Sequence, residues 1–374
     1  KKSGRLSPWS LAVKDMTTLE STARRSDPPR VEGLGAEQRP AKGASLRPIG
    51  MVRGAVCFLM IFGAGCFGPP ALSHGATGDS GAYTNPVYAA SMPDPSVIRH
   101  EGVYYAFGTT GNSRTPDGRI FTVLRSRNLV EWEALGGALK PPSPNRQVQY
   151  WAPEVVFHRD TFYLYYSMGG LEPEKFELRV ATSSRPQGPY EDAGRRLLDC
   201  ETNRFTIDAF PFRDDDGQWY LFYARNFTNS APGQHPGTAL VVDRLLDMTR
   251  LAGDCRVVVR ARYDWTLFEA HRRMDVYGAT FDWHTIEGPC VVKHAGRYYC
   301  FYSGANYQTD RYGVDYVVAD HPLGPYTGQG DRARVLRSVP GHVPAHPGST
   351  RTLLHMAVGH DPVHHRVQAL PFRR

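Results

Sequence analysis

The chain has 374 residues, of which 22% are charged, and a formal net charge of +7. Nearly all of this positive charge lies before residue 77, so the rest of the chain is close to neutral and nucleic-acid binding is not indicated. The sequence contains no P-loop, no G-x-S-x-G elbow and no H-E-x-x-H motif. Nucleotide-binding, serine-hydrolase and zincin functions therefore lack support.

Two segments precede the region that we expect to fold. Residues 1–50 are rich in Arg, Pro and Gly without a sustained apolar period, and we interpret them as disordered or as a non-native upstream extension. Residues 51–76 place Arg53 before a short apolar run and then small residues, which is the pattern of a secretory signal peptide. The sequence thus predicts a secreted protein, extracellular or periplasmic, without a membrane span; lipoprotein anchoring at Cys66 is the alternative.

An aromatic phrase recurs along residues 77–374. Each copy is rich in β-branched and aromatic residues and follows a turn, which is typical of a strand. In chain order the copies are VYYAFGTT from Val103, FYLYYSMG from Phe162, WYLFYARN from Trp219, YYCFYSGA from Tyr298 and the degenerate TLLHMAVG from Thr352. A further apolar phrase follows several copies, and helical periodicity is almost absent. The five repeats predict an all-β five-bladed β-propeller of four-stranded blades, with a β-sandwich as the alternative.

A polar residue stands ahead of each aromatic strand. These residues are Asp94, Glu154, Asp208, Glu287 and His342. Taken singly, each acid could be a turn residue or a charge at a strand end. Radial repetition, however, would bring equivalent positions of successive blades to one central axis. A ring of carboxylates in a confined space is costly and usually marks function.

The strings around the four acids together resemble glycoside hydrolase family 43. They read PDPSVI around Asp94, YWAPEVVFHRDTFYLYYS around Glu154, TIDAFPFRDDDGQWYLFY around Asp208 and IEGPCVVKHAGRYYCFYSG around Glu287, and the resemblance runs from residue 83 to the C-terminus. It implies hydrolysis of arabinose- or xylose-containing glycans with inversion. It also implies that Asp94 is the general base, Glu287 the general acid and Asp208 the carboxylate that sets the acid's pKa and orientation. Trp151 and Glu154 are the implied substrate-binding residues.

The chemistry of inversion explains why carboxylates are needed. One carboxylate takes a proton from water on one face of the sugar, and a protonated carboxyl about 6.5–9.5 Å away gives a proton to the leaving oxygen. We expect the pKa of Glu287 to be raised by the negative charge of Asp208. Asp94 must stay ionised, so we expect it to be better hydrogen-bonded or nearer to solvent.

The chemistry itself requires no cofactor, but a metal ion is an open question at His342. The Pro-Gly-His string that ends at His342 resembles a family motif near a central calcium or water, so a structural calcium ion at the propeller axis is an expectation. A zinc pair of His342 and His346 on a helix is excluded, because Pro344 and Pro347 prevent a regular helix.

Four cysteines follow the signal peptide. We expect a hairpin with strands on either side of a loop at residues 294–296, which would place Cys290 opposite Cys300, so that a cross-strand disulfide could form there. Cys200 and Cys255 are the other candidate pair. Free thiols at all four positions are the alternative.

These observations predict a secreted, monomeric enzyme that acts on a plant polysaccharide or oligosaccharide, as an exo-acting α-L-arabinofuranosidase or β-xylosidase. An insert at residues 262–284 would close one end of a groove, which favours exo action over the alternative of an endo-α-1,5-L-arabinanase. A related fructan-acting propeller family is disfavoured because its usual strings are absent. A non-catalytic glycan-binding propeller is the alternative from another class, but both Asp94 and Glu287 are present.

Overall fold

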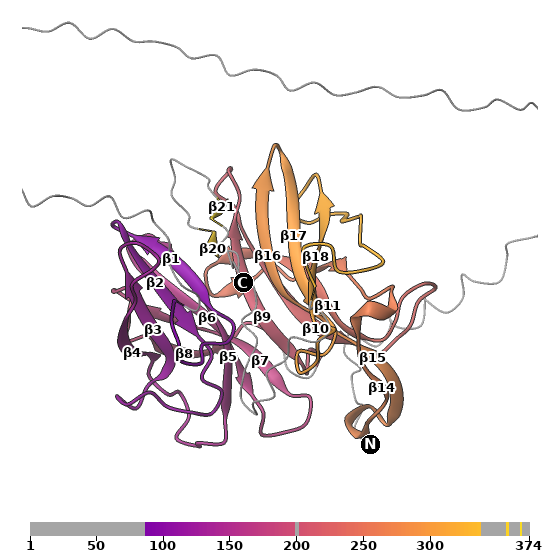
Figure 1. Cartoon of the computed structure of the whole chain (residues 1–374), viewed down its shortest axis with the longest axis horizontal. Coiled ribbons are helices and arrows are strands. Elements are labelled where there is room, and N and C mark those ends of the chain that lie inside the picture. The colour runs from indigo at the N-terminus through magenta and orange to yellow at the C-terminus, as the bar shows by residue number, and fades with distance from the viewer. Residues whose placement is uncertain (1–86, 199–201, 338–356, 359–366, 369–374) are drawn as a thin grey trace, which may run out of the picture. The chain divides into compact units, whose positions relative to one another are not determined.

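The computed structural model describes residues 87–198 and 202–337, together with the short strands at residues 357–358 and 367–368 (Figure 1). Most of the described chain forms four antiparallel sheets that follow one another in sequence. We call them blades 1 to 4. Each blade begins with a strand that leads into one of the aromatic phrases.

The strands are as follows. Blade 1 contains β1 (Ser96–His100), β2 (Val103–Gly108), β3 (Ile120–Ser126) and β4 (Glu133–Leu139). Blade 2 contains β5 (Gln149–His158), β6 (Thr161–Gly169), β7 (Phe176–Ser183) and β8 (Glu191–Arg196). Blade 3 contains β9 (Thr206–Arg213), β10 (Trp219–Phe227) and β11 (Gly237–Asp247), with β12 (Arg250–Leu251), β13 (Arg256–Val259), β14 (Leu267–Met274) and β15 (Ala279–His284) added. Blade 4 contains β16 (Ile286–His294), β17 (Arg297–Gly304), β18 (Gly313–Ala319) and β19 (Leu336–Arg337).

The blades are arranged side by side through their first strands. β1 lies next to β5, β5 next to β9, and β9 next to β16. This succession of innermost strands is the radial arrangement of a propeller. The predicted fifth blade lies almost wholly outside the described residues; from that region only β20 (Ala357–Val358), which pairs with β21 (Val367–Gln368), is described, and β1 lies next to β20.

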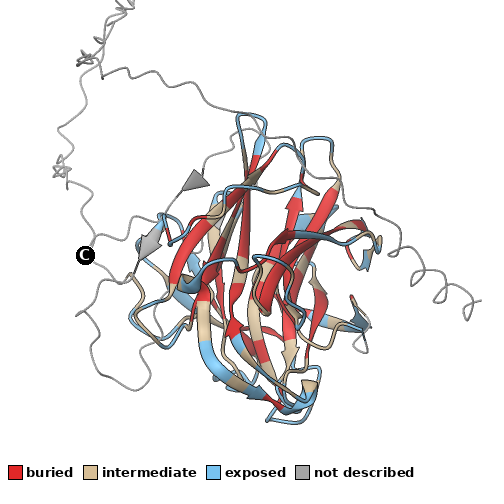
Figure 2. Cartoon of the chain, turned by 90° about the vertical axis from the view of Figure 1, so that its right-hand side faces the viewer, coloured by how far each residue is buried: buried red, intermediate tan, exposed pale blue. Residues whose placement is uncertain are grey.

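The aromatic phrases form the second strand of each blade because both of their faces are covered. Successive residues of a strand point to opposite faces. In β6, Tyr166 packs in a cluster with Phe107 of blade 1, whereas Tyr165 packs in a cluster with Leu221 of blade 3. Figure 2 shows buried residues along most of these strands. A strand buried on both faces needs a continuous apolar sequence, which explains the phrases.

The hairpin of blade 4 differs from the prediction by one residue. Its loop is the two-residue turn of Ala295 and Gly296, which both have positive φ values of 48° and 77°. A two-residue turn of this kind fits the twist of a hairpin. The shorter loop shifts the register, so that Val291 rather than Cys290 lies opposite Cys300.

Among the described cysteines, the alternative of free thiols holds. Cys290 and Cys300 are both buried thiols, and burial raises the pKa of Cys300 well above its ordinary value. Cys255 is also a thiol, and it accepts a hydrogen bond from the Tyr223 hydroxyl at 3.6 Å. The structure therefore lacks the pairing of Cys255 with Cys200, which itself lies outside the described residues.

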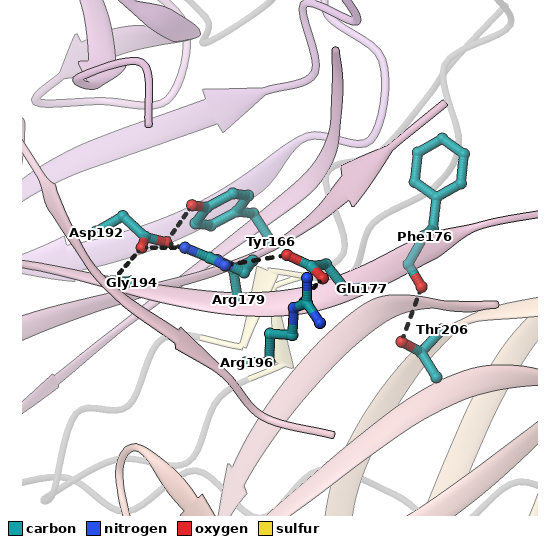
Figure 3. A network of polar contacts seen from close by, with 8 residues as sticks. All are labelled: Tyr166, Phe176, Glu177, Arg179, Asp192, Gly194, Arg196 and Thr206. Atoms are coloured by element: carbon teal, nitrogen blue, oxygen red, sulfur yellow. Dashed lines mark hydrogen bonds and ion pairs between the residues drawn. The ribbon is translucent and has the colours of Figure 1, made fainter. Parts of the chain in front are cut away.

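A network of ion pairs and hydrogen bonds links β8, the outer strand of blade 2, to β7 and β6 (Figure 3). Arg179 on β7 contacts Asp192 on β8 at 2.5 Å and Glu177 on its own strand at 3.0 Å. Tyr166 on β6 donates a hydrogen bond to Asp192, and Arg196 on β8 contacts Glu177 at 2.6 Å. The Arg179 and Asp192 side chains are only 10% and 3% exposed. Removal of the cation would therefore leave a buried carboxylate without its charge partner.

We expect Arg179→Ala to lower the free energy of unfolding by about 3–5 kcal/mol, because it breaks a buried ion pair on one side only. Urea unfolding followed by circular dichroism would measure the change. The matched control is Arg185→Ala, which removes an exposed arginine from the next loop of the same blade. Equal stability of the two variants would show that the network contributes little.

The predicted insert at residues 262–284 forms the β14–β15 hairpin with the short helices η2 (Asp264–Thr266) and η3 (Asp275–Tyr277). Arg272 on β14 contacts Glu174 of blade 2 at 2.7 Å. The Asn226 amide donates to both Glu174 and the Tyr277 hydroxyl, at 3.2 and 3.0 Å. The hairpin is therefore tied to the loop between β6 and β7.

Within the described residues, η2 and η3 are the helical segments, and neither is long enough to cross a membrane. The predicted upstream extension (residues 1–50) and signal peptide (residues 51–76) lie outside the described residues. These two predictions remain predictions.

Candidate functional site

A cavity of about 310 Å³ opens where the first strands of the four blades meet. It brings together five of the residues predicted from the sequence, and these are Asp94, Trp151, Glu154, Asp208 and Glu287. The sixth, His342, lies outside the described residues. The carboxylates come from four different blades, so only the folded chain places them in one space.

The acids do not occupy equivalent positions, contrary to the sequence interpretation. At the start of each blade one residue has a left-handed backbone, and these residues are Asp94 (φ 48°), Ala152 (φ 47°), Asp208 (φ 58°) and Gly288 (φ 60°). Pairing with the second strand shifts at this point in blades 2, 3 and 4. Residues other than glycine rarely hold this conformation, and such strain gathers at functional sites.

The remaining two acids lie on either side of this position. Glu287 immediately precedes the left-handed residue of blade 4, and Glu154 follows that of blade 2 by two residues. A bulge re-aims the side chains beside it. This is how residues at different offsets reach the same cavity, and it explains why Gly288 directly follows an acid.

In blades 2, 3 and 4, the backbone amide of the left-handed residue donates a hydrogen bond to a side chain of the preceding blade. The Ala152 amide donates to the Thr109 hydroxyl at 2.7 Å, and the Asp208 amide donates to the Ser167 hydroxyl at 3.1 Å. The Gly288 amide donates to Oδ2 of Asp208 at 2.9 Å. Asp208 is thus held directly beside the backbone of Glu287.

Asp94 is oriented by a hydroxyl whose own direction is fixed. Thr109 donates to Oδ2 of Asp94 at 2.7 Å while it accepts from the Ala152 amide. Since the hydroxyl has a single proton, the amide bond directs that proton toward Asp94. Asp94 therefore accepts a directed hydrogen bond from this hydroxyl.

Glu287 has an environment that disfavours its charge. Burial raises the pKa of its carboxyl to about 8, with further contributions from the negative charges of Asp208 and then Asp94. A hydrogen bond from the Tyr312 hydroxyl to Oε1, at 2.7 Å, opposes this increase. The predicted direction is confirmed, but burial has a larger effect than Asp208.

Comparison with known proteins identifies the chain. The family model of glycosyl hydrolases family 43 matches residues 83–342. The chain belongs to this family. Its likeness to solved family members also confirms the predicted all-β five-bladed propeller fold.

Proteins similar to this family 43 chain are named for several different activities. It is 27% identical to the β-D-galactofuranosidase xynD of Aspergillus niger over 258 residues, which are 65% of each chain. It is 28% identical to an arabinoxylan arabinofuranohydrolase of Paenibacillus polymyxa over 63% of this chain and 39% of that one. The crystal structure of a thermostable family-43 glycoside hydrolase superposes with a TM-score of 0.56 at 31% identity, over 68% of this chain and 77% of that one. The chain thus spans less than two thirds of the length of these curated relatives.

Aromatic side chains form part of the wall of the family 43 cavity. Trp151 stacks on Phe176 with 3.8 Å between ring centroids, and its indole N–H donates to Gln149 at 3.0 Å. Tyr307 lines the cavity and is 52% exposed. Tyr150, in contrast, is completely buried and belongs to the core. Trp151 and Tyr307 therefore both offer an apolar ring face to a sugar.

Sequence interpretation missed two polar residues of this site. Thr109 has a detectable signal, because a hydroxyl residue lies near the end of the aromatic phrase in blades 1, 2 and 4, opposite the beginning of the blade. These residues are Thr109, Ser167 and Ser303. Tyr312 has no such signal, since it lies in a loop 25 residues after Glu287. Only folding brings that loop to the acid.

No metal site is evident in the part of the chain that the structure describes. Among residues 87–198 and 202–337, no group of three or more His, Cys, Asp or Glu side chains could hold a metal ion. The expected calcium depends on His342, so it remains a proposal.

Proposed function

We propose that this family 43 chain is an inverting glycoside hydrolase that removes terminal arabinose or xylose units from plant oligosaccharides or polysaccharides. The observation that carries the proposal is the cavity shared by Asp94, Asp208 and Glu287, in which the pKa of Glu287 is about 8. This pKa keeps Glu287 protonated at neutral pH, as a general acid requires. Glycosidases usually use two carboxyl groups in different environments, one protonated and one ionised.

In the proposed reaction, Asp94 removes a proton from a water molecule as the water oxygen bonds to the anomeric carbon. Glu287 gives its proton to the glycosidic oxygen, whose bond to that carbon breaks. The product sugar has the inverted configuration. Asp208 transfers no proton; its charge helps to keep Glu287 protonated before the reaction.

Exo action is supported by the size of the cavity. Its volume of about 310 Å³ is at the small end of the range for ligand pockets, about 300–1,000 Å³. A space of this size suits a chain end better than the middle of a polymer. The insert at residues 262–284 does not contribute, because none of its residues lines the cavity.

The proposed sugar is α-L-arabinofuranose first and β-D-xylose second. One curated relative is named as an arabinoxylan arabinofuranohydrolase and another as a β-xylosidase. The β-D-galactofuranosidase adds a third sugar to be tested. Endo action on arabinan is the alternative, since other relatives are named as probable arabinan endo-1,5-α-L-arabinosidases.

The test is a substrate panel of the 4-nitrophenyl glycosides of α-L-arabinofuranose, β-D-xylose and β-D-galactofuranose, with linear arabinan. Release of 4-nitrophenol, with an initial free sugar of the opposite anomeric configuration by NMR, is the expected result. Cleavage of arabinan alone, into oligosaccharides, would establish the endo alternative. Binding of these sugars without cleavage would favour the non-catalytic propeller.

Export as a monomer is also proposed. It is supported by the signal-like sequence at residues 51–76 and by relatives named as extracellular enzymes. Expression of the chain in a bacterial host, followed by N-terminal sequencing of the periplasmic and medium fractions, would locate a cleavage site near Ala76. Light scattering of the purified product would give its oligomeric state.

The pH dependence of kcat/KM should reflect Glu287. The acid is active when protonated, so kcat/KM should fall as the pH rises past about 8. Asp208→Asn removes a negative charge that raises this pKa, so the decline should begin at a lower pH. Profiles of both proteins on one aryl glycoside would measure this. An unchanged alkaline limb in Asp208→Asn would contradict the assigned electrostatic effect.

A further inference from the structure

Tyr312 is a polar partner of the acid that comes from outside the first strands. It lies at the end of the loop between β17 and β18, next to Gly313, which pairs with Gly304. Its hydroxyl donates to Oε1 of Glu287 at 2.7 Å, and the residue lines the cavity. Ser303, which lies opposite Glu287, also contacts the Tyr312 hydroxyl.

The loop that carries Tyr312 is held by contacts at its beginning. The Ala305 amide donates to the carbonyl of Thr285 at 3.3 Å, just before β16. The Asn306 amide group donates to the carbonyl of Phe268 on β14 at 3.4 Å. The Thr309 hydroxyl closes a turn on the carbonyl of Asn306 at 2.9 Å. The insert thus supports the loop beside the cavity, although it does not line the cavity itself.

The groups around Glu287 shift its pKa in opposite directions. Asp208 from β9 and Asp94 from the segment before β1 both disfavour its charge, whereas Tyr312 favours it. Burial and the neighbouring Glu287 raise the pKa of Tyr312 well above its ordinary value, so the phenol remains a neutral donor. Among the described residues whose effect on the pKa of Glu287 is resolved, Tyr312 is the one that stabilises the carboxylate.

We propose that Tyr312 is a positioning residue for the acid, and that its hydrogen bond to Oε1 directs the transferable proton to Oε2. This inference rests on the proposed function. When Glu287 gives up its proton, the bond from Tyr312 becomes a hydrogen bond to a full carboxylate, which is about twice as strong. Tyr312 therefore stabilises the charge that develops on Glu287 as the leaving oxygen is protonated.

The experiment is Tyr312→Phe, which removes one hydroxyl and keeps the ring. The alkaline limb of kcat/KM should move to higher pH, because the variant loses a bond that lowers the pKa of Glu287. For an alkyl glycoside, whose leaving group needs the acid, kcat should fall about 10- to 100-fold. For the 4-nitrophenyl glycoside, whose leaving group needs little protonation, kcat should change much less.

The matched control is Tyr316→Phe, which removes a hydroxyl from β18 at a ring that packs on Tyr299 and Phe301. This variant should not change the pH at which kcat/KM declines. An unchanged alkaline limb in Tyr312→Phe, or equal losses on both leaving groups, would overturn the inference. A second variant, Ser303→Ala, should shift the limb in the same direction by less, because it weakens the donor. Its unchanged profile would likewise count against the inference.

A readout without turnover separates this inference from the proposed function. The pKa of Glu287 can be measured by carbon-13 NMR of the labelled carboxyl, with Glu287→Gln to assign the signal. A higher pKa in Tyr312→Phe than in the unaltered chain supports the positioning role even if no substrate is cleaved. An equal pKa in the two proteins refutes it even if the chain is an active hydrolase.

Discussion

Glu287→Gln is expected to lower kcat on an alkyl arabinofuranoside or xyloside by about 10²–10⁴-fold, which is the usual contribution of general acid–base catalysis. The amide is nearly the same size as the carboxyl but cannot give a proton to the leaving oxygen. Its expected effect on a 4-nitrophenyl glycoside is much smaller, since 4-nitrophenolate leaves without help. The ratio of the two losses is the measurement, because it identifies a proton donor rather than a damaged site.

The matched control for Glu287→Gln is Glu191→Gln, on the exposed edge strand β8, where the side chain pairs with Lys140. It should retain full activity on both substrates. A loss of activity in Glu287→Gln that is equal for good and poor leaving groups would contradict the acid assignment. It would then point to a role of Glu287 in sugar binding.

Asp94→Asn is expected to lower kcat by about 10²–10⁴-fold on every substrate, whatever its leaving group. Water must lose a proton as it attacks, and an asparagine cannot accept one. Thr109 would still contact the side chain, so sugar binding and KM should change little. Azide is an anion that attacks without loss of a proton, so added azide should restore part of the activity and yield a glycosyl azide of inverted configuration.

Asp160→Asn is the control for Asp94→Asn. Asp160 lies in the exposed turn between β5 and β6 and also has a positive φ value, 59°, so the replacement tests the residue type in a similar backbone away from the cavity. We expect normal activity and no response to azide. Failure of azide to restore any activity in Asp94→Asn, with normal sugar binding, would contradict the base assignment.

The sequence by itself determined the repeat and the residue types of the site. The aromatic phrases predict the second strands because a strand covered on both faces must be apolar along its whole length. The acids stand out because carboxylates ahead of buried strands have no role in packing. Neither inference requires knowledge of contacts between distant residues.

Only the tertiary structure decided the geometry around those acids. Asp94 and Asp208 themselves have the left-handed backbone, whereas Glu287 precedes the residue that has it. In blades 3 and 4 this difference depends on how the first strand pairs with the second. The hairpin register depends on a loop that is one residue shorter than predicted, and Cys290 therefore does not lie opposite Cys300. In a hairpin the register is set by the type and length of the turn, so an error of one residue in the loop changes every cross-strand pair.

The pKa of Glu287 shows most clearly which properties follow from the sequence and which depend on the fold. Its residue type was evident from the sequence, and Asp208 was correctly expected to raise the pKa. Burial, which has the larger effect, and Tyr312, which opposes it, could not be anticipated. Desolvation and hydrogen bonding depend on which atoms surround a group in space, and here those atoms come from four blades and a distant loop. The sequence thus determined which groups can do chemistry, and the fold decided how each of them is charged and held.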